Sequence, residues 1–316
     1  MKQKKQPCPA QFHRILEDFI AYLRSKELKE STIKQQSDVI ASALFKLDSY
    51  GLTQIGQLTP AMIYRIYENT SDKNNFVYPM RSFLNFLYLT GNTIKNYSAI
   101  VPARKKSYPN PSVYSYSEIE AFLASFDLSV PIDIRDYAIA LLALRIGMRT
   151  SDIASLKLDN IDFHKKKISF VQSKTGNPQC LELVPELENA LREYITKVRP
   201  ITDTQNVFIS FAKSHFPIDK RSIYYRIKKH FLESGIQNGN RKCGAHALRM
   251  TLASELIYEQ IPYDVVRKIL GHEDAKTMKH YIQFDVEKLR RCAIEVPTLT
   301  GKISRFFAGD MEELPL

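Results

Sequence analysis

The chain has 316 residues, enough for two domains of ordinary size, and its hydrophobic content of 44% is sufficient to form buried cores. No apolar run approaches the roughly 18 residues that a membrane-spanning helix needs, and no apolar segment follows the basic N-terminus as in a signal peptide. The formal net charge of +11 favours a polyanionic partner, nucleic acid first and an anionic membrane surface second. The four cysteines are far apart without a CxxC pair, which argues against zinc and favours free thiols in a reducing cytoplasm.

The first third of the chain has the apolar spacing of four short helices. A stripe that starts at Phe12 recurs at i, i+3, i+4 and i+7 and predicts an amphipathic helix. A second helix is expected to begin at Ser31, and a third at Thr59, a capping residue followed by proline. The fourth ends at Gly91. These helices are expected to form a compact bundle over residues 10–97.

A change in composition follows the bundle. Residues 98–112 contain three prolines and the basic run Arg104, Lys105 and Lys106, with no acidic residue. Because proline disfavours helix, an extended basic linker is expected here. Its charge suits a DNA backbone, although an ordinary solvated loop has the same composition.

A second domain is expected to begin near residue 113. Ser115 or Ser117 is placed to cap its first helix, and a strongly apolar segment over residues 133–146 predicts a buried helix. Gly147 should end that helix, with Thr150 or Ser151 capping the next one.

The segment 161–185 changes to a strand pattern. Two β-rich runs surround Lys174-Thr-Gly-Asn-Pro, which predicts a hairpin, and the chain then returns to helices. The predicted fold class is therefore mainly α with a small antiparallel β-sheet. It comprises the N-terminal bundle, a mixed domain over residues 113–295 and a tail at 296–316.

Four segments of the second domain carry polar residues in suggestive places. Taken singly, each has an ordinary structural explanation, such as a surface ion pair, a solvated turn lysine, or one packed tyrosine among 17. His246 and Arg249 are three residues apart, so on a helix they share a face and can reach one anion. The full set is Arg149, Asp152, Lys174, His246, Arg249, His272 and Tyr281.

The order of these residues is more specific than any one of them. They read Arg, Lys, His-x-x-Arg, Gly-His, Tyr, which resembles the tyrosine recombinase (phage integrase) family. Gly-Met-Arg-Thr-Ser-Asp-Ile resembles that family's first arginine box, and His-Ala-Leu-Arg with Ile-Leu-Gly-His resembles its second. The steps of 23 residues from Arg249 to His272 and nine more to Tyr281 also match. The bundle resembles the family's core-binding domain, and the simple two-domain type without an arm-binding domain is expected.

The resemblance implies a site-specific recombinase that cuts and rejoins duplex DNA through a 3′-phosphotyrosyl link to Tyr281. Strands would be exchanged through a Holliday junction during integration, excision or transposition of a mobile element. Two arginines, Arg149 and Arg249, can clamp the nonbridging phosphate oxygens and stabilise the charge that develops there.

The remaining residues of the set receive supporting roles. His272 is expected to add a hydrogen bond to the phosphate, and Lys174 matches the family's general acid for the departing 5′-oxygen. His246 is the expected base, since it can accept the tyrosine proton. Asp152 is expected to orient Arg149 or His246.

Further basic residues are expected to bind DNA phosphates, and the helix near residues 221–231 is a candidate for a major groove. The predicted contacts are Arg104, Lys105, Lys106, Lys220, Arg221, Arg226, Lys228, Lys229, Arg241 and Lys242. The expected partner is duplex DNA with inverted-repeat core sites, bound by a homo-tetramer that is a monomer or dimer without DNA, with or without accessory proteins.

The resemblance implies no metal and no nucleotide cofactor, and the sequence contains neither a P-loop nor an acidic metal motif. The expected location is the cytoplasm, in association with the nucleoid. Two alternatives are a type IB topoisomerase, which shares the chemistry but needs no specific site, and a DNA-binding regulator without catalysis. The separate bundle and the Gly-His spacing favour the recombinase over the former, and the intact set of residues argues against the latter.

Overall fold

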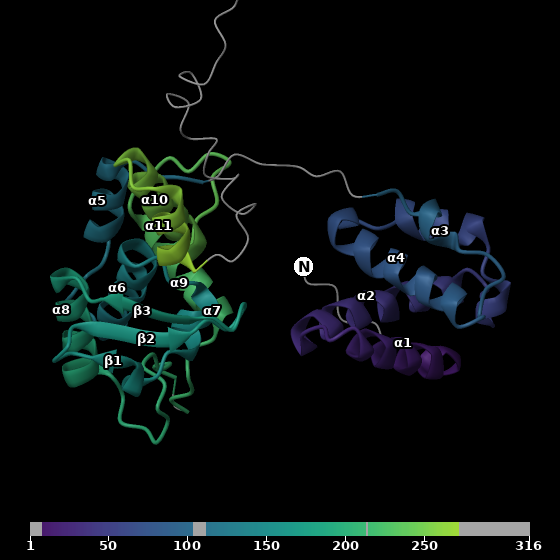
Figure 1. Ribbon diagram of the computed structural model, residues 1–316, viewed down its shortest axis with the longest axis horizontal. Helices are drawn as coiled ribbons and strands as arrows, with labels where there is room; N and C mark the ends of the chain where they lie inside the picture. Colours follow the sequence, from purple (N-terminus) through teal and green to yellow (C-terminus); the bar gives the residue numbers. More distant parts are fainter. Residues whose placement is uncertain (1–7, 104–111, 213, 272–316) are drawn as a thin grey trace, which may run out of the picture. The chain divides into compact units, whose positions relative to one another are not determined.

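The computed structural model describes residues 8–103, 112–212 and 214–271. The chain divides into two compact units, Met1–Ser107 and Tyr108–Leu316. Figure 1 colours the first unit purple to blue and the second teal to yellow. No helix in the described ranges is both long and apolar enough to cross a membrane.

In its described part the first unit is a bundle of four α-helices, with short 3-10 turns before the first helix, between the second and third, and after the fourth. Thr59 caps the third helix by accepting a hydrogen bond from the backbone N of Met62 at 3.3 Å, and Pro60 occupies its first turn. The core packs Phe19 against Phe83 with ring centroids 5.2 Å apart. The helices are α1 (His13–Ser25), α2 (Glu30–Ser49), α3 (Pro60–Glu68) and α4 (Lys73–Leu89).

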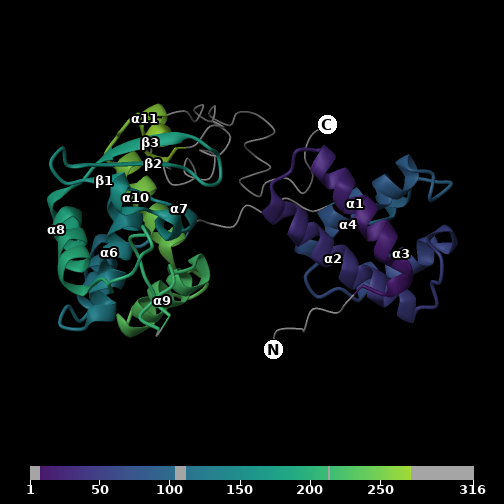
Figure 2. The same cartoon turned by 90° about the horizontal axis from the view of Figure 1, so that it is seen from below.

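The second unit surrounds a buried central helix, α6 (Pro131–Arg145), of which 11 of 15 residues are buried. Several helices that follow it in the chain pack against it. In Figure 2 the sheet lies on one side of the unit and α9 on the other. The other helices are α5 (Tyr116–Ala124), α7 (Thr150–Ser155), α8 (Pro185–Glu193), α9 (Lys220–Glu233), α10 (Ala245–Tyr258) and α11 (Tyr263–Leu270).

Three antiparallel strands form the sheet in the order β1-β2-β3. They are β1 (Ile161–Asp162), β2 (Lys167–Val171) and β3 (Pro178–Glu182), and the register pairs Lys167 with Glu182 and Val171 with Pro178. Ile168 is buried on the core side, whereas its neighbours on β2 are exposed, as expected for a sheet with one solvated face. The predicted fold class, mainly α with a small antiparallel sheet, is confirmed.

Most predicted helix ends agree with the structure to within one or two residues. Ser115 caps α5 in a capping box with Glu118, as one of the two predicted alternatives. The prediction that Thr150 or Ser151 caps the next helix is wrong. Arg149 occupies the cap position, because the turn at Gly147 leaves Arg149 extended and α7 begins directly after it.

Candidate active site

Arg149 is positioned by a tight turn between α6 and α7. Gly147 makes this turn with φ +66°, and a Cβ there would lie 2.7 Å from Cδ2 of Leu270. Arg149 Nη1 donates to Oε1 of Gln172 at 2.5 Å, and Nη2 donates to the carbonyl of Gly271 at 3.2 Å. The side chain therefore joins the end of the sheet to the end of α11.

Arg249 reaches the same place from α10. Its side chain is buried, with Nη1 donating to the carbonyl of Gly147 and Nη2 to the carbonyl of Leu270 at 2.6 Å. The C-terminal end of a helix carries partial negative charge, which favours cations there. Both predicted arginines thus converge on the carbonyls at the end of α11, those of Leu270 and Gly271.

His246 lies one turn before Arg249 on α10, as the i, i+3 spacing predicted. The residue is exposed, yet the protein around its ring desolvates it and lowers its pKa below the ordinary value of 6.5. The positive charges of Arg249, Lys242, Lys174 and Arg149 lower that pKa further. The structure therefore brings four predicted site residues into one electrostatic neighbourhood, a cationic surface that can bind an anion.

Asp152 does not have the expected partner. Its carboxylate is 2% exposed, and Oδ1 accepts a hydrogen bond from the backbone N of Ser173 at 2.8 Å. In the described part of the chain, Oδ2 has no hydrogen-bond partner. The expectation that Asp152 orients Arg149 or His246 is corrected accordingly, because the carboxylate instead fastens the base of the β2–β3 hairpin to α7.

Gln172, which the sequence analysis missed, supplies the side-chain contact to Arg149. An available signal was its place, a polar amide at the end of an apolar strand run and two residues before Lys174. Gly271 ends α11 in the left-handed conformation at φ +60°. The predicted residues His272 and Tyr281 lie outside the described residues, as do Arg104, Lys105 and Lys106.

The predicted DNA contacts divide into two groups. Lys220, Arg221, Lys229 and Lys242 are exposed, and Lys228 is partly exposed. Lys229 Nζ also lies 3.4 Å from a carboxylate oxygen of Glu233, within an exposed pair. These side chains can meet a phosphate backbone without losing a buried partner.

Arg226 and Arg241 form ion pairs with carboxylates of the second unit. Arg226 donates to Asp136 and, at 3.1 Å, to Asp133. Arg241 donates through two nitrogens to Glu118, at 2.9 and 2.5 Å, and holds the pKa of that carboxyl at about 2. We therefore remove both arginines from the expected DNA contacts, since counting basic residues does not reveal their carboxylate partners.

A cluster of ionisable groups joins α6 to α9. Asp133, Asp136 and His230 are buried, and each offers one potential metal-ligand atom within 4.8 Å of the others, a group that the sequence analysis did not foresee. The carboxylates, however, already accept hydrogen bonds from Arg135 and Arg226. Two negative and two positive charges balance, so a metal ion would have to displace a guanidinium.

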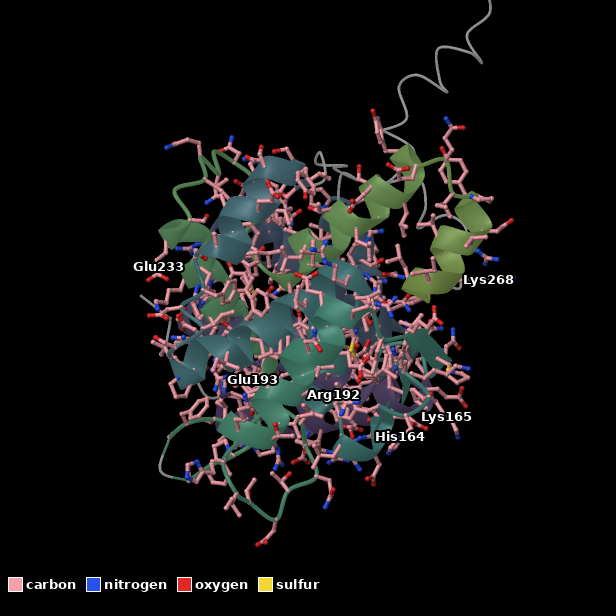
Figure 3. All side chains as sticks on the ribbon, turned by 90° about the vertical axis from the view of Figure 1, so that its left-hand side faces the viewer. His164, Lys165, Arg192, Glu193, Glu233 and Lys268 are labelled. Carbon is pink, nitrogen blue, oxygen red and sulfur yellow. The ribbon has the colours of Figure 1, made fainter. Side chains whose placement is uncertain are left out.

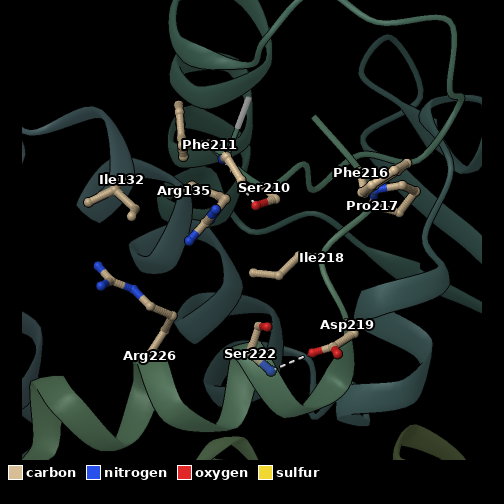
Figure 4. Close-up of a pocket in the computed structure, with 11 residues that line it drawn as sticks. Ile132, Arg135, Ser210, Phe211, Phe216, Pro217, Ile218, Asp219, Ser222 and Arg226 are labelled. Carbon is tan, nitrogen blue, oxygen red and sulfur yellow. Dashed lines mark hydrogen bonds between the residues drawn. The ribbon is translucent and has the colours of Figure 1, made fainter. Parts of the chain in front are cut away.

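A pocket also lies near α9, where the N-terminal parts of α6 and α9 meet the segment before α9 (Figure 4). Asp219 caps α9 by accepting a hydrogen bond from the backbone N of Ser222 at 2.6 Å. Figure 3 shows Glu233, at the end of α9, and Lys268 of α11 on opposite sides of the second unit. The lining includes Ile132, Arg135, Phe211, Phe216, Ile218 and Arg226. Its arginines are engaged in ion pairs, and we assign the pocket no ligand.

Comparison with known proteins identifies one family. Residues 114–288, more than half of the chain, match the model of the phage integrase family. The chain is 26% identical over 226 residues to the putative integrase/recombinase y4rF of Sinorhizobium fredii, covering 69% of this chain and 52% of y4rF. It is 30% identical over 223 residues to tyrosine recombinase XerC of Caldanaerobacter subterraneus, covering 69% and 60%. The chain thus spans about half the length of the first of these relatives.

Solved structures share the fold. A lambda integrase (residues 75–356) dimer bound to a COC′ core site aligns with TM-score 0.65 at 18% identity, over 85% of this chain and 94% of that one. XerH recombinase bound to a palindromic difH substrate aligns with TM-score 0.66 at 17% identity, over 92% and 97%. At these identities the likeness shows the fold of the chain.

Proposed function

This chain belongs to the phage integrase family, and from that membership we propose that it is a tyrosine-type site-specific DNA recombinase. One observation carries the proposal. Arg149 and Arg249, 100 residues apart in the sequence, converge beside His246 and Lys174 at the end of α11. Such a cationic site suits a phosphodiester whose nonbridging oxygens gain charge during reaction.

The proposed reaction is a transesterification with Tyr281 as nucleophile. Its phenolic oxygen attacks the scissile phosphorus, the bond from phosphorus to the 5′-oxygen breaks, and a 3′-phosphotyrosyl link forms. His246 accepts the phenol proton, and its lowered pKa supports this role because it favours the neutral ring, which can accept a proton. Lys174 donates a proton to the departing 5′-oxygen, and attack by a 5′-hydroxyl reverses the steps.

The phosphate would be held by the two arginines together with His272. Arg149 uses two N–H groups on Gln172 and Gly271, and a guanidinium has five, so it can bind a phosphate oxygen while it keeps these contacts. Asp152 supports the site by fixing the hairpin that carries Lys174.

We assign DNA binding to the bundle that was expected over residues 10–97 and catalysis to residues 113–295, followed by the tail 296–316. The basic linker expected over 98–112 would join them after Val101, because Tyr97–Ile100 form a 3-10 helix and Val101 is buried in the core of the bundle. The basic residues around α9 and in the linker would contact phosphates, which gives affinity and salt dependence. The substrate we propose is a pair of duplexes with inverted-repeat core sites. Lambda integrase of the same fold forms a tetramer on a Holliday junction. By analogy, four copies would exchange strands to integrate, excise or transpose a mobile element in the cytoplasm, at the nucleoid.

The test is covalent capture on a nicked suicide duplex whose site is first selected, by binding to the protein, from a library of inverted repeats. Wild type should give an SDS-resistant protein–DNA band, and Tyr281→Phe should give none. A band with Tyr281→Phe, or none with wild type, contradicts the mechanism. Binding without any adduct would favour a regulator, and relaxation of supercoiled plasmids lacking the site would favour a topoisomerase.

A further inference from the structure

Gln172 is a buried polar residue at the junction of three segments of the candidate site. It follows β2, is 2% exposed, and has several partners for its side-chain amide. Oε1 accepts hydrogen bonds from Arg149 Nη1 at 2.5 Å and from Thr175 Oγ1 at 2.8 Å, while Nε2 donates to the carbonyl of Leu270 at 3.3 Å. A buried amide with these partners fixes the groups around it, because any partner left unpaired would be costly.

The packing around Gln172 has little room for adjustment. A Cβ at Gly271 would overlap the Gln172 side chain, so the close approach requires a glycine there. Arg149 donates to the carbonyl of the same glycine. One nitrogen of the guanidinium is therefore held by Gln172 and another by the helix end that Gln172 packs against.

The same residue closes the base of the hairpin. Its backbone N donates to the carbonyl of Asn177 at 2.9 Å, and its carbonyl accepts from the backbone N of Gly176 at 2.8 Å. The next residue, Ser173, is bound by Asp152. The backbone of the hairpin thus has its own supports, whereas the side-chain amide of Gln172 is the group that reaches Arg149.

We propose that Gln172 is a positioning residue that sets the orientation of the Arg149 guanidinium toward the scissile phosphate. This inference rests on the proposed recombinase function. An arginine side chain has many rotamers, and clamping of a phosphate by its planar fork depends on its orientation. Gln172 therefore acts on the cleavage step through Arg149, without touching DNA itself.

Gln172→Met tests this role, because methionine is close in size and removes the hydrogen bonds of the amide. The rate of covalent-complex formation on the suicide duplex should fall about 10- to 100-fold, the range for a lost hydrogen bond to a charged group. The Kd for the same duplex should stay within about 3-fold, because nonspecific phosphate contacts supply most of the affinity. Gln179→Met on β3 is the matched control, since the side chain of Gln179 donates only to the carbonyl of Pro178 among the hydrogen bonds described, and it should cleave at the wild-type rate.

A duplex with sulfur in place of the bridging 5′-oxygen separates Arg149 from Lys174. A thiolate leaves without a proton donor, so this substrate should restore cleavage by Lys174→Ala. The defect of Gln172→Met should persist on it, because the arginine clamp is still needed. Recovery of Gln172→Met to the wild-type rate would instead mean that Gln172 acts through the hairpin, and would overturn the proposal.

Gln172→Glu is the conservative variant, since it keeps an acceptor oxygen for Arg149. It should cleave at least about 5-fold faster than Gln172→Met, as expected if an acceptor for a charged donor is what matters. If Gln172→Met does not fold, a rate for Gln172→Glu more than about 10-fold below wild type overturns the proposal. If the wild-type protein cleaves and Gln172→Met is equally active, the role of Gln172 is refuted and the recombinase function stands. If the wild-type protein does not cleave at all, the recombinase function is refuted.

Discussion

Arg226→Met separates two opposite expectations for one residue. The basic residues around Arg226 in the sequence predict a DNA contact. In the structure, however, its guanidinium donates to Asp136 and Asp133. The side chain of Arg226 is 24% exposed, and those of the two aspartates are 0% and 10% exposed. Methionine retains an apolar stem in the same space and removes the charge. The carboxylates then lose a partner that water cannot fully replace.

The expected loss of stability follows from this burial. Removing one member of a buried ion pair costs about 3–5 kcal/mol. Asp136 keeps Arg135 as a second partner at 2.8 Å, and Arg226 is partly exposed, so the lower end of about 3 kcal/mol applies. Lys229→Met on the same helix is the matched control. Its pair with Glu233 is nearly half exposed on both sides, and its loss should cost less than about 1 kcal/mol.

Hydrogen exchange in the full chain measures this effect locally. Peptides from α6 and α9 report the free energy of opening of the second unit, and the reading does not depend on the two units unfolding together. Both helices should exchange faster in Arg226→Met and hardly faster in Lys229→Met. In parallel, the affinity for duplex DNA is measured against salt concentration. Arg226→Met should leave the slope of log K against log salt unchanged, and Arg221→Met should reduce it by about 0.9.

If exchange in α6 and α9 changes by less than about 0.5 kcal/mol and the salt slope falls by about 0.9, Arg226 contacts DNA and its internal ion pairs contribute little.

Three further predictions follow from the described geometry. Gly147→Ala forces alanine to φ +66° with its Cβ 2.7 Å from Leu270, and should lower the free energy of unfolding by about 3 kcal/mol in chemical denaturation. Gly176→Ala, at φ +83° with nothing within 4 Å, should cost only about 1 kcal/mol, and equal losses would contradict the packing argument. Burial lowers the pKa of His230 below 6.5 against the opposing charges of Asp133, Asp136 and Glu233. The unfolded chain therefore binds the proton first, and stability should be full above pH 6.5 and decline below it. Thermal denaturation at pH 7 and at lower pH should show a smaller decline for His230→Phe than for wild type, and an equal decline would exclude His230 as the cause. Because the pKa of His246 is lowered, the acid-side midpoint of the pH–rate profile for covalent-complex formation should lie below pH 6.5, and a midpoint above that value would contradict its role as base.

The parts of the site that sequence predicts are those set by local spacing. His246 and Arg249 share a helix face because they are three residues apart, and Gly271 ends α11 because it adopts a left-handed conformation. Contacts between distant segments carry no such pattern. Arg226 lies 90 residues from Asp136, and Arg241 lies 123 residues from Glu118. A count of basic residues therefore treats as DNA contacts two arginines that the fold uses internally.

The sequence does not reveal the role of Gln172, and it suggests the wrong partner for Asp152, for a related reason. Both lie close in sequence to residues of the expected set, but their contacts depend on how the hairpin lies against α7. Strand patterns predict which residues pair, and they do not predict which element the turn touches. The amide partner of Arg149 and the backbone partner of Asp152 become evident only once these elements are packed.

The packing also links the segment of Gly147 and Arg149 to the segments that carry Arg249 and Gly271. Gly147, two residues before Arg149, has no room for a Cβ because Leu270 and Leu252 lie against it, and its carbonyl binds Arg249. Gly271 in turn has no room because Gln172 lies against it, and its carbonyl binds Arg149. Each glycine thus belongs to one segment and supports the arginine of the other. A larger residue at either glycine should therefore displace both guanidinium groups together. A substitution in one segment should then disturb the arginine of the other segment as well.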